Sequence, residues 1–155
     1  MAPSFLLDLS SIDLNKTIIT LDEIRRTIPQ RFEMEMLSGI VYDEGGSIMG
    51  YKDVTLDDFW VRGHIPGRPL MPGVMMIECA AQLCAFWTMR KQPEMGFVGF
   101  AKCDEVRFRG TVVPPGRLYM ISQMVEINRR RAIAKCQGIH NGSLVFEATV
   151  TGMGV

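Results

Sequence analysis

Histidine and cysteine are scarce in this chain of 155 residues, which contains two histidines and four cysteines. The cysteines stand at positions 79, 84, 103 and 136, so no C-x-x-C pair occurs, and two histidines cannot complete a familiar zinc pattern with them. We therefore expect no metal site. Reduced thiols, packed as small apolar side chains in a cytoplasmic protein, are the simplest interpretation.

The chain also lacks a net charge. Its 17 lysines and arginines balance 17 aspartates and glutamates, so the formal charge at pH 7 is zero. Nothing in this balance indicates general binding to nucleic acid or to a membrane surface. An acidic partner would have to be recognised by a local basic patch.

No run of apolar residues is long enough to predict a membrane span. The most apolar segment, residues 74–89, is interrupted by two polar residues and falls short of the ~20 apolar residues that a bilayer requires. The N-terminus has no basic n-region, and Asp8 interrupts its apolar stretch, so it does not predict a secretory signal. Repeats, low-complexity tracts and linkers are missing too. We expect an N-terminal arm over residues 1–19 and a single domain over residues 20–155.

The expected secondary structure places one long helix among short strands. Thr20 and Glu23 form a capping-box pattern at the start of a short helix, and Asn141-Gly142 is the strongest hairpin signal. The predicted helices cover residues 21–28 and 74–89, with a short helical turn at 55–60, and the predicted strands cover residues 32–43, 47–54, 96–109, 117–127, 131–140 and 144–150. In the last strand, alternation from Leu144 predicts one apolar face. Because only the long helix can cover one face of such an antiparallel sheet, we expect an α+β fold.

The chemically distinctive part of the chain is the segment GHIPGRPLMPGVMMIECAAQ, which begins at Gly63. His64 lies in a Gly- and Pro-rich turn where a helix cannot run. Pro72 and Gly73 then open the apolar helix, since proline is favoured in a first turn. Glu78 is the only acid in the apolar run, and such a carboxyl is costly unless it is paired, neutral or functional.

Ordinary structural roles fit His64 and Glu78 as well. A histidine in a loop is more often a surface residue than a catalyst. Glu78 is also compatible with a core carboxyl that Gln82 hydrogen-bonds one turn further on. Perturbed groups occur in structural networks too, so the spacing alone leaves both interpretations open.

The segment closely resembles the active-site segment of the FabZ-type β-hydroxyacyl-[acyl carrier protein] dehydratases, hotdog-fold enzymes of type II fatty acid synthesis. Their pattern is G-H-F-P…P-x-x-P-G-V…E-A-x-A-Q, and this chain has the same residue at Gly63, His64, Pro66, Pro69, Pro72, Gly73, Val74, Glu78, Ala81 and Gln82. The interval between histidine and glutamate (78 − 64 = 14) is also the family's. Glutamate rather than aspartate favours the FabZ-like branch over the FabA-like one. Weaker similarity continues through IPQRF, KDVT and VRFRGTVVPPG.

The resemblance implies a curled antiparallel sheet wrapped around one central helix. It also implies dehydration of a (3R)-hydroxyacyl-[acyl carrier protein] to the trans-2-enoyl product. His64 would be the base, since histidine titrates near pH 7. Glu78 would be the acid, because desolvation in an apolar helix disfavours its charged form. The backbone N–H groups of Gly73 and Val74 would stabilise the negative charge on the thioester oxygen.

The resemblance further implies a homodimer in which the histidine of one subunit meets the glutamate of its neighbour, with a trimer of dimers as the family's usual further step. Pro72 and Gln82 would support the site, and no cofactor and no metal are implied. Docking of the acidic carrier protein would need a local basic patch. The candidate docking residues are Arg68, Lys102, Arg107 and Arg109. Arg107 and Arg109 share one face of a predicted strand, for which a solvated surface is the commoner explanation.

Four departures from the family pattern leave room for a specialised paralogue with another chain length or carrier. Gln30 stands where the family usually has histidine, Ile65 where it has phenylalanine, and Arg117 where P-G-D has aspartate. Residues 36–40 replace a run like L-L-V-D-R. The alternatives to a dehydratase are a hotdog acyl-thioesterase or CoA-thioester hydratase, and a non-catalytic acyl-binding hotdog protein. The retained histidine–glutamate pair argues against both.

Overall fold

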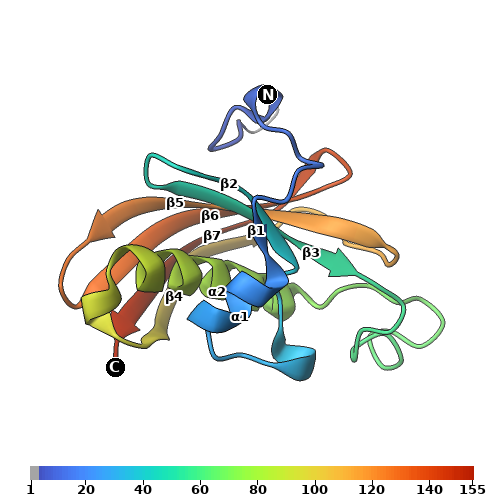
Figure 1. Cartoon of the computed structure of the whole chain (residues 1–155). Helices are drawn as coiled ribbons and strands as arrows, with labels where there is room; N and C mark the ends of the chain where they lie inside the picture. The colour runs from blue at the N-terminus through green and yellow to red at the C-terminus, as the bar shows by residue number, and fades with distance from the viewer. Residues whose placement is uncertain (1–3) are drawn as a thin grey trace.

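The structure is a computed structural model that describes residues 4–155. Within this range, seven antiparallel strands form one sheet in the order β1-β2-β3-β5-β6-β7-β4. The strands are β1 (Ile19–Thr20), β2 (Gly39–Glu44), β3 (Ser47–Val54), β4 (Val98–Phe108), β5 (Gly116–Ile127), β6 (Arg131–His140) and β7 (Ser143–Gly154). The helices are α1 (Leu21–Thr27) and α2 (Gly73–Lys91), with short 3-10 turns η1 (Leu9–Ser11), η2 (Phe32–Met34) and η3 (Pro93–Met95). The sheet curls around α2, which runs along its concave face (Figure 1).

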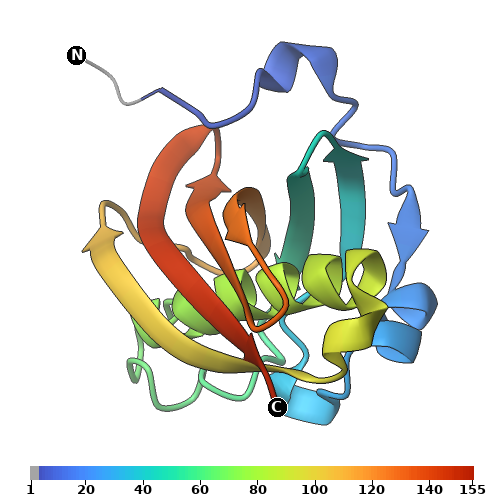
Figure 2. The same cartoon turned by 90° about the vertical axis from the view of Figure 1, so that its left-hand side faces the viewer.

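Helix α2 is enclosed by the sheet, with strands on either side of it in Figure 2. Its most buried residues pack into one core with inward-facing strand residues, among them Cys79, Ala80, Leu83, Phe86, Leu118, Met120 and Phe146. An apolar helix without a polar face needs such an enclosure, and the α+β hotdog fold expected from the sequence is confirmed. No helix in the described part of the chain combines the length and the apolar character that crossing a bilayer requires.

Most of the strand predictions are confirmed. β3 and β6 have the predicted bounds, and β5 begins one residue before its predicted start. In β7, the alternating residues Phe146, Ala148 and Val150 face the core around α2, as predicted. The register shifts just before them, so that Val145 rather than Leu144 joins this core. A single bulged residue exchanges the faces of a strand, and the alternation prediction is therefore wrong for Leu144.

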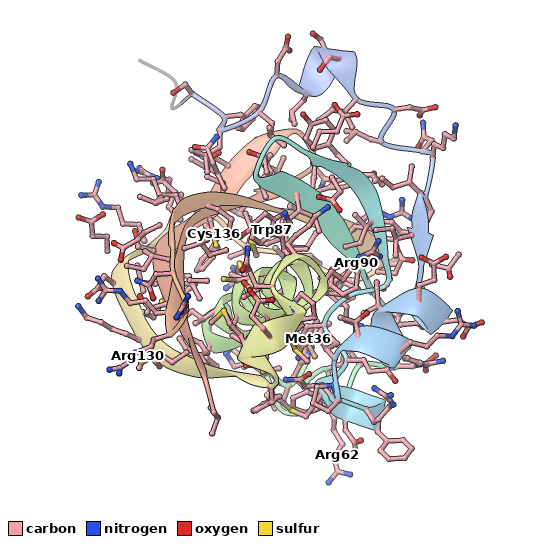
Figure 3. All side chains as sticks on the ribbon, turned by 60° about the vertical axis from the view of Figure 1, so that its left-hand side comes forward. Met36, Arg62, Trp87, Arg90, Arg130 and Cys136 are labelled. Atoms are coloured by element: carbon pink, nitrogen blue, oxygen red, sulfur yellow. The ribbon has the colours of Figure 1, made fainter. Side chains whose placement is uncertain are left out.

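The strand predicted over residues 32–43 is wrong in its first half, because η2 occupies its start and β2 begins only at Gly39. The backbone between them is bonded by a side chain instead of a neighbouring strand. Gln82 accepts a hydrogen bond from the N–H of Met36 (2.9 Å) and donates one to the carbonyl of Met34 (2.6 Å). Met36 is 1% exposed and lies beside α2 (Figure 3).

Residues 55–60 form turns rather than the predicted helical turn. The carboxylate of Asp58 accepts hydrogen bonds from the N–H of Thr55 (2.8 Å) and from the ammonium of Lys52 (3.0 Å). Asp58 therefore holds the turn that follows β3 and does not cap a helix. Thr20 likewise precedes α1 without a side-chain capping bond, so the predicted capping box is not formed.

The N-terminal arm, whose described part is residues 4–18, crosses the outer face of the sheet (Figure 2). The first three residues of the predicted arm lie outside the described range. The apolar arm residues that pack on this face are Phe5, Leu6, Leu7, Leu9, Ile12 and Leu14, and the buried sheet residues beneath them are Val41, Met49, Tyr51, Ile121 and Ile139. Gln137 accepts from the N–H of Leu6 (2.7 Å) and donates to the carbonyl of Ser4 (3.0 Å). The sheet is apolar on both faces because the arm covers the second one.

Arg117, one of the departures from the family pattern, supports the end of this arm. Its guanidinium carbon lies 3.8 Å from the centroid of the Tyr51 ring, and its Nε lies 2.8 Å from Asp53 Oδ1. Tyr119, whose ring centroid is 5.8 Å from the same carbon, donates its hydroxyl to the carbonyl of Leu14 (3.2 Å). An aspartate at position 117 would repel Asp53 and could not stack on either ring. Arg117 therefore stabilises the tyrosines against which the end of the arm packs.

All four cysteines are free thiols, and three of them are buried, as the sequence predicts. Burial raises the pKa of Cys79 to about 12 and that of Cys84 to about 11. Burial also raises the pKa of Cys136, which is a residue of β6 and belongs to the core around α2 (Figure 3). Cys103 is partly exposed. The buried thiols are therefore protonated packing groups, because a neutral pH lies far below their pKa values.

Candidate active site

The loop between β3 and α2 holds His64 through backbone hydrogen bonds. The buried Trp60 provides a carbonyl that accepts from the N–H groups of Gly63 (3.2 Å) and His64 (2.7 Å). The carbonyl of Leu70 lies 2.8 Å from His64 Nδ1, and the Leu70 N–H donates to the His64 carbonyl (3.0 Å). Because a carbonyl can only accept, Nδ1 carries the hydrogen, and Nε2 of the neutral ring has a free lone pair. The loop therefore presents His64 in the tautomer that a base requires.

Ile65 and Arg68 close a tight turn directly after this histidine. Each donates its N–H to the carbonyl of the other, at 3.2 Å from Ile65 and 2.8 Å from Arg68. Both side chains are exposed. The cation of Arg68 is therefore available on the surface near the histidine loop, and its role in docking stays a prediction.

Glu78 and Gln82 form the hydrogen bond that their spacing predicts. Gln82 Nε2 donates to Glu78 Oε1 at 2.8 Å. Gln82 is 2% exposed, and its orientation is fixed by the backbone of Met34 and Met36, which binds its Nε2 and Oε1 respectively. Among residues 4–155, no donor pairs with Oε2 of Glu78. When this carboxyl is protonated, the proton therefore belongs on Oε2, since Oε1 already accepts an N–H.

The N-terminus of α2 provides open backbone donors. Pro72 occupies the N-cap position, rather than the first helical turn expected from the sequence, and gives no side-chain bond to that turn. The N–H groups of Gly73 and Val74 have no intrahelical partner by their position. The helix dipole adds partial positive charge at the same point. These groups can stabilise a negatively charged oxygen placed before the helix.

A glycine is required at position 73 by an aromatic ring. A Cβ on Gly73 would lie 2.8 Å from Cε1 and 3.0 Å from Cζ of Phe108. The Phe108 ring also packs on buried Phe146, with 5.8 Å between centroids. The end of β4 is thereby pressed against the first turn of α2. The close approach of a thioester to Gly73, which the sequence also suggests, stays a prediction.

Large apolar side chains stand exposed around this helix terminus. Val74 is 67% exposed, and Phe108, whose ring lies against Gly73, is 51% exposed. Others in the loop and beside it are Leu56, Phe59, Ile65 and Val113. Single exposed apolar residues are ordinary, but a concentrated group marks an interaction surface.

His64 and Glu78 are not joined within one chain. Each has its own partner, Leu70 for the histidine and Gln82 for the glutamate, and no hydrogen bond connects them among the residues that the structure describes. The expectation that they meet across two subunits stays a prediction.

The basic strand residues proposed for docking are partly neutralised. Arg109 Nε lies 2.6 Å from Glu147 Oε2, and Lys102 Nζ lies 3.2 Å from Asp104 Oδ2. Arg107 makes no ion pair within the described range. Arg107 and Arg109 line a surface hollow of about 470 Å³ on the outer face of the sheet, together with acidic residues. Arg107 is therefore the strand cation best placed to meet an acidic partner.

Several supporting groups could not be found from residue types. The Leu70 carbonyl and the Met34 and Met36 backbone act through peptide groups that every residue has. In the sequence, Phe108 is simply one apolar residue of the predicted strand 96–109. As for metals, residues 4–155 contain no cluster of three or more His, Cys, Asp or Glu side chains that could hold an ion.

Fold and site together define a hotdog-fold protein with a histidine loop and one glutamate on its apolar central helix. The model of the FabA-like domain family matches residues 28–149, and this chain belongs to that family. The 3-hydroxyacyl-[acyl-carrier-protein] dehydratase FabZ of Teredinibacter turnerae is 38% identical over 133 residues, covering 83% of this chain and 91% of that protein. The dehydratase FabZ of Clostridium botulinum is 32% identical over 132 residues, covering 84% and 92%.

Solved structures agree on the fold. The dehydratase heterocomplex ApeI:P from Xenorhabdus doucetiae matches with a TM-score of 0.73 at 13% identity, over 85% of this chain and 90% of that one. Zebra fish thioesterase superfamily member 2 matches with a TM-score of 0.64 at 13% identity, over 88% and 99%. At such identities the likeness concerns the fold alone, since one fold serves several thioester chemistries.

Proposed function

We propose that this chain dehydrates (3R)-hydroxyacyl-[acyl carrier protein] to the trans-2-enoyl thioester, the dehydration step of type II fatty acid synthesis. The observation that carries the proposal is the fixed tautomer of His64, whose Nε2 is free because Nδ1–H is bound by the Leu70 carbonyl. The sequence relatives named as dehydratases support the same reaction.

The first step is removal of a proton from the α carbon by His64 Nε2. The Leu70 carbonyl then stabilises the imidazolium through the Nδ1–H bond. As the proton leaves, negative charge grows on the thioester oxygen. The N–H groups of Gly73 and Val74 stabilise that charge at the helix terminus.

The second step expels the β-hydroxyl group. Oε2 of Glu78 gives its proton to this hydroxyl, the C–O bond breaks, and water leaves as the C=C bond forms. Gln82 Nε2 keeps Oε1 engaged, so the acidic hydrogen stays on the oxygen that faces the substrate. Transfer of the proton held by His64 back to Glu78 through solvent restores both groups.

We further propose that the active unit is a homodimer with two shared sites, each using His64 of one subunit and Glu78 of the other. The lack of a His64–Glu78 bond within the described chain supports this arrangement, as does the exposed apolar group around Val74. Assembly into a trimer of dimers rests on the family resemblance alone. Free cysteines fit a cytoplasmic location.

The test is to incubate the pure protein with crotonyl and 3-hydroxyacyl thioesters of acyl carrier protein and, in parallel, with the corresponding CoA thioesters. We expect the two thioesters to interconvert with no release of free thiol, and Glu78→Gln protein to serve as the inactive control. Release of free carrier thiol would instead identify a thioesterase. Binding without any turnover would identify an acyl-binding protein, and equal or faster turnover of CoA thioesters a CoA-thioester hydratase.

A further inference from the structure

Gln30, another departure from the family pattern, has a buried polar atom without a partner. It follows α1, and its Oε1 is inaccessible to solvent and makes no hydrogen bond to any described residue. A buried amide atom without a partner is costly and rare in native proteins. The position therefore needs a hydrogen-bonding group that the polypeptide itself does not supply.

A small, partly open cavity is lined by Gln30 and also by Gln82. It offers about 10 Å³ to the centre of a water molecule, which is about the volume that one water needs. Its lining contains four polar side chains and four apolar ones: Arg25, Gln30, Glu35 and Gln82, and Leu21, Ile24, Ile28 and Leu37. A buried water usually has two to four polar partners, so this cavity has both the size and the chemistry of a single-water site.

Gln82 has one hydrogen-bonding position left for such a water. Both Nε2 hydrogens are used, toward Met34 and Glu78, and Oε1 accepts from the Met36 N–H. An amide oxygen has two lone pairs, so one acceptor site on Oε1 remains. A water in the cavity can donate one hydrogen to it and the other to Gln30 Oε1. If the Gln30 amide is turned over, its N–H donates to the water, which still donates to Gln82.

We propose that one water molecule joins Gln30 to Gln82 in this cavity, making Gln30 a positioning residue for Glu78. The inference rests on the proposed function for its kinetic part only. The water fixes the Gln82 amide from the side opposite Glu78. It thereby keeps Nε2–H on Oε1 and leaves Oε2 for the substrate. A histidine, the usual residue of the family at this position, can place a ring nitrogen in the same cavity and donate a hydrogen bond to Gln82 Oε1 directly.

The structural test is a crystal structure of the wild-type protein at a resolution that shows ordered water. We expect density for one water within about 3.2 Å of both Gln30 and Gln82, and its loss in Gln30→Leu protein. An empty cavity in the wild type overturns the proposal. This readout does not depend on any activity, so it separates failure of the inference from failure of the proposed dehydration.

The kinetic test compares Gln30→Leu with Gln30→His. Leucine keeps the bulk but removes the hydrogen bond, and we expect kcat to fall about 3- to 10-fold with KM nearly unchanged, since a slightly misplaced acid slows the chemical step. Histidine should restore most of kcat. Wild-type kcat in the leucine protein, or no recovery with histidine, contradicts a positioning role. A loss that appears equally in KM would indicate a general structural effect and would also contradict it.

Discussion

Gln82 donates one hydrogen bond to Glu78 Oε1 at 2.8 Å, while the backbone of residues 34 and 36 binds its second Nε2 hydrogen and one lone pair of its Oε1. The Glu78 carboxyl group is thereby held by a glutamine that is itself bonded to a segment 46 to 48 residues away from Gln82 in the sequence. A side chain on α2 and the chain before β2 act as one unit.

Replacing Gln82 by leucine should therefore damage both stability and catalysis. The change leaves the Met36 N–H and the Met34 carbonyl unpaired, and each such buried group costs roughly 1–3 kcal/mol. We expect the unfolding free energy from urea titration to fall by about 2–5 kcal/mol, and kcat to fall in the protein that remains folded. The control is Glu44→Ala, a substitution at an exposed residue at the end of β2. An unchanged denaturation midpoint would show that the hydrogen bonds between Gln82 and the backbone of residues 34 and 36 do not stabilise the fold.

His64→Ala and Glu78→Gln should each lower kcat by at least ~10²-fold, because general acid–base groups usually contribute 10²–10⁴. Both changes should leave the thermal midpoint nearly unaltered. Glutamine at 78 still offers an oxygen to Gln82 but has no acidic hydrogen. Steady-state kinetics on the hydroxyacyl carrier thioester measure the effect, and near-wild-type turnover in either variant would remove that residue from the chemistry.

Mixing these two inactive proteins should restore activity. A mixed dimer regains one intact site out of two, because an unchanged His64 then faces an unchanged Glu78 across the interface. At equal amounts, about a quarter of wild-type activity is expected, since half of randomly paired dimers are mixed and each has one site. Subunit exchange must be verified with differently tagged chains. If exchange occurs and activity stays at the level of the single variants, the site lies within one chain.

Arg107→Glu should weaken use of the carrier-bound substrate. Among the strand cations proposed for docking, Arg109 and Lys102 form ion pairs with acids, whereas Arg107 forms none with any described residue. We expect KM for the carrier thioester to rise and its salt dependence to decrease, with little change on a pantetheine analogue. Reversing Arg109 as well should add to the effect.

Arg130→Glu is the matched control for the carrier experiment. Arg130 lies in the turn between β5 and β6, where its carbonyl accepts from the N–H of Gly154, and Figure 3 shows it at the rim of the molecule. The same reversal of charge should leave the carrier KM as it was. Equal losses on carrier and analogue with Arg107→Glu would mean that this arginine supports the fold and not docking.

Deleting residues 1–16 should destabilise the protein and make it associate. The deletion uncovers the apolar outer face around Met49 and Ile121, and a newly exposed apolar patch promotes self-association. Sedimentation velocity and urea titration measure the two effects. Arg117→Ala, which removes the stacking on Tyr51 and Tyr119 and the ion pair with Asp53, should cost about 1–2 kcal/mol. A truncated protein with the sedimentation and midpoint of the full chain would show that the arm contributes nothing.

The sequence predicts the parts of this protein that depend on local pattern or on a continuous motif. Helix α2 follows from its long, predominantly apolar run, and the Glu78–Gln82 bond follows from one helical turn of spacing. The tautomer of His64 does not, because it depends on a backbone carbonyl that the loop folds back toward the ring.

Long-range contacts account for the wrong predictions. The segment after α1 has the composition of a strand, yet Gln82 takes the backbone bonds that a neighbouring strand would have supplied. In β7, one bulged residue moves Val145 into the core in place of Leu144, and no residue type announces it. The outer-face position of the arm likewise requires knowledge of which strands lie side by side.

The arm also constrains the order in which the parts of the fold can form. Its bonds to Gln137 span 131 and 133 residues, from Leu6 and Ser4 respectively. The arm therefore has no complete binding site until β6 has formed, and contacts of such separation form late in folding. Until then the apolar residues of the arm are exposed to solvent, and transiently exposed apolar surface makes a folding chain prone to aggregation.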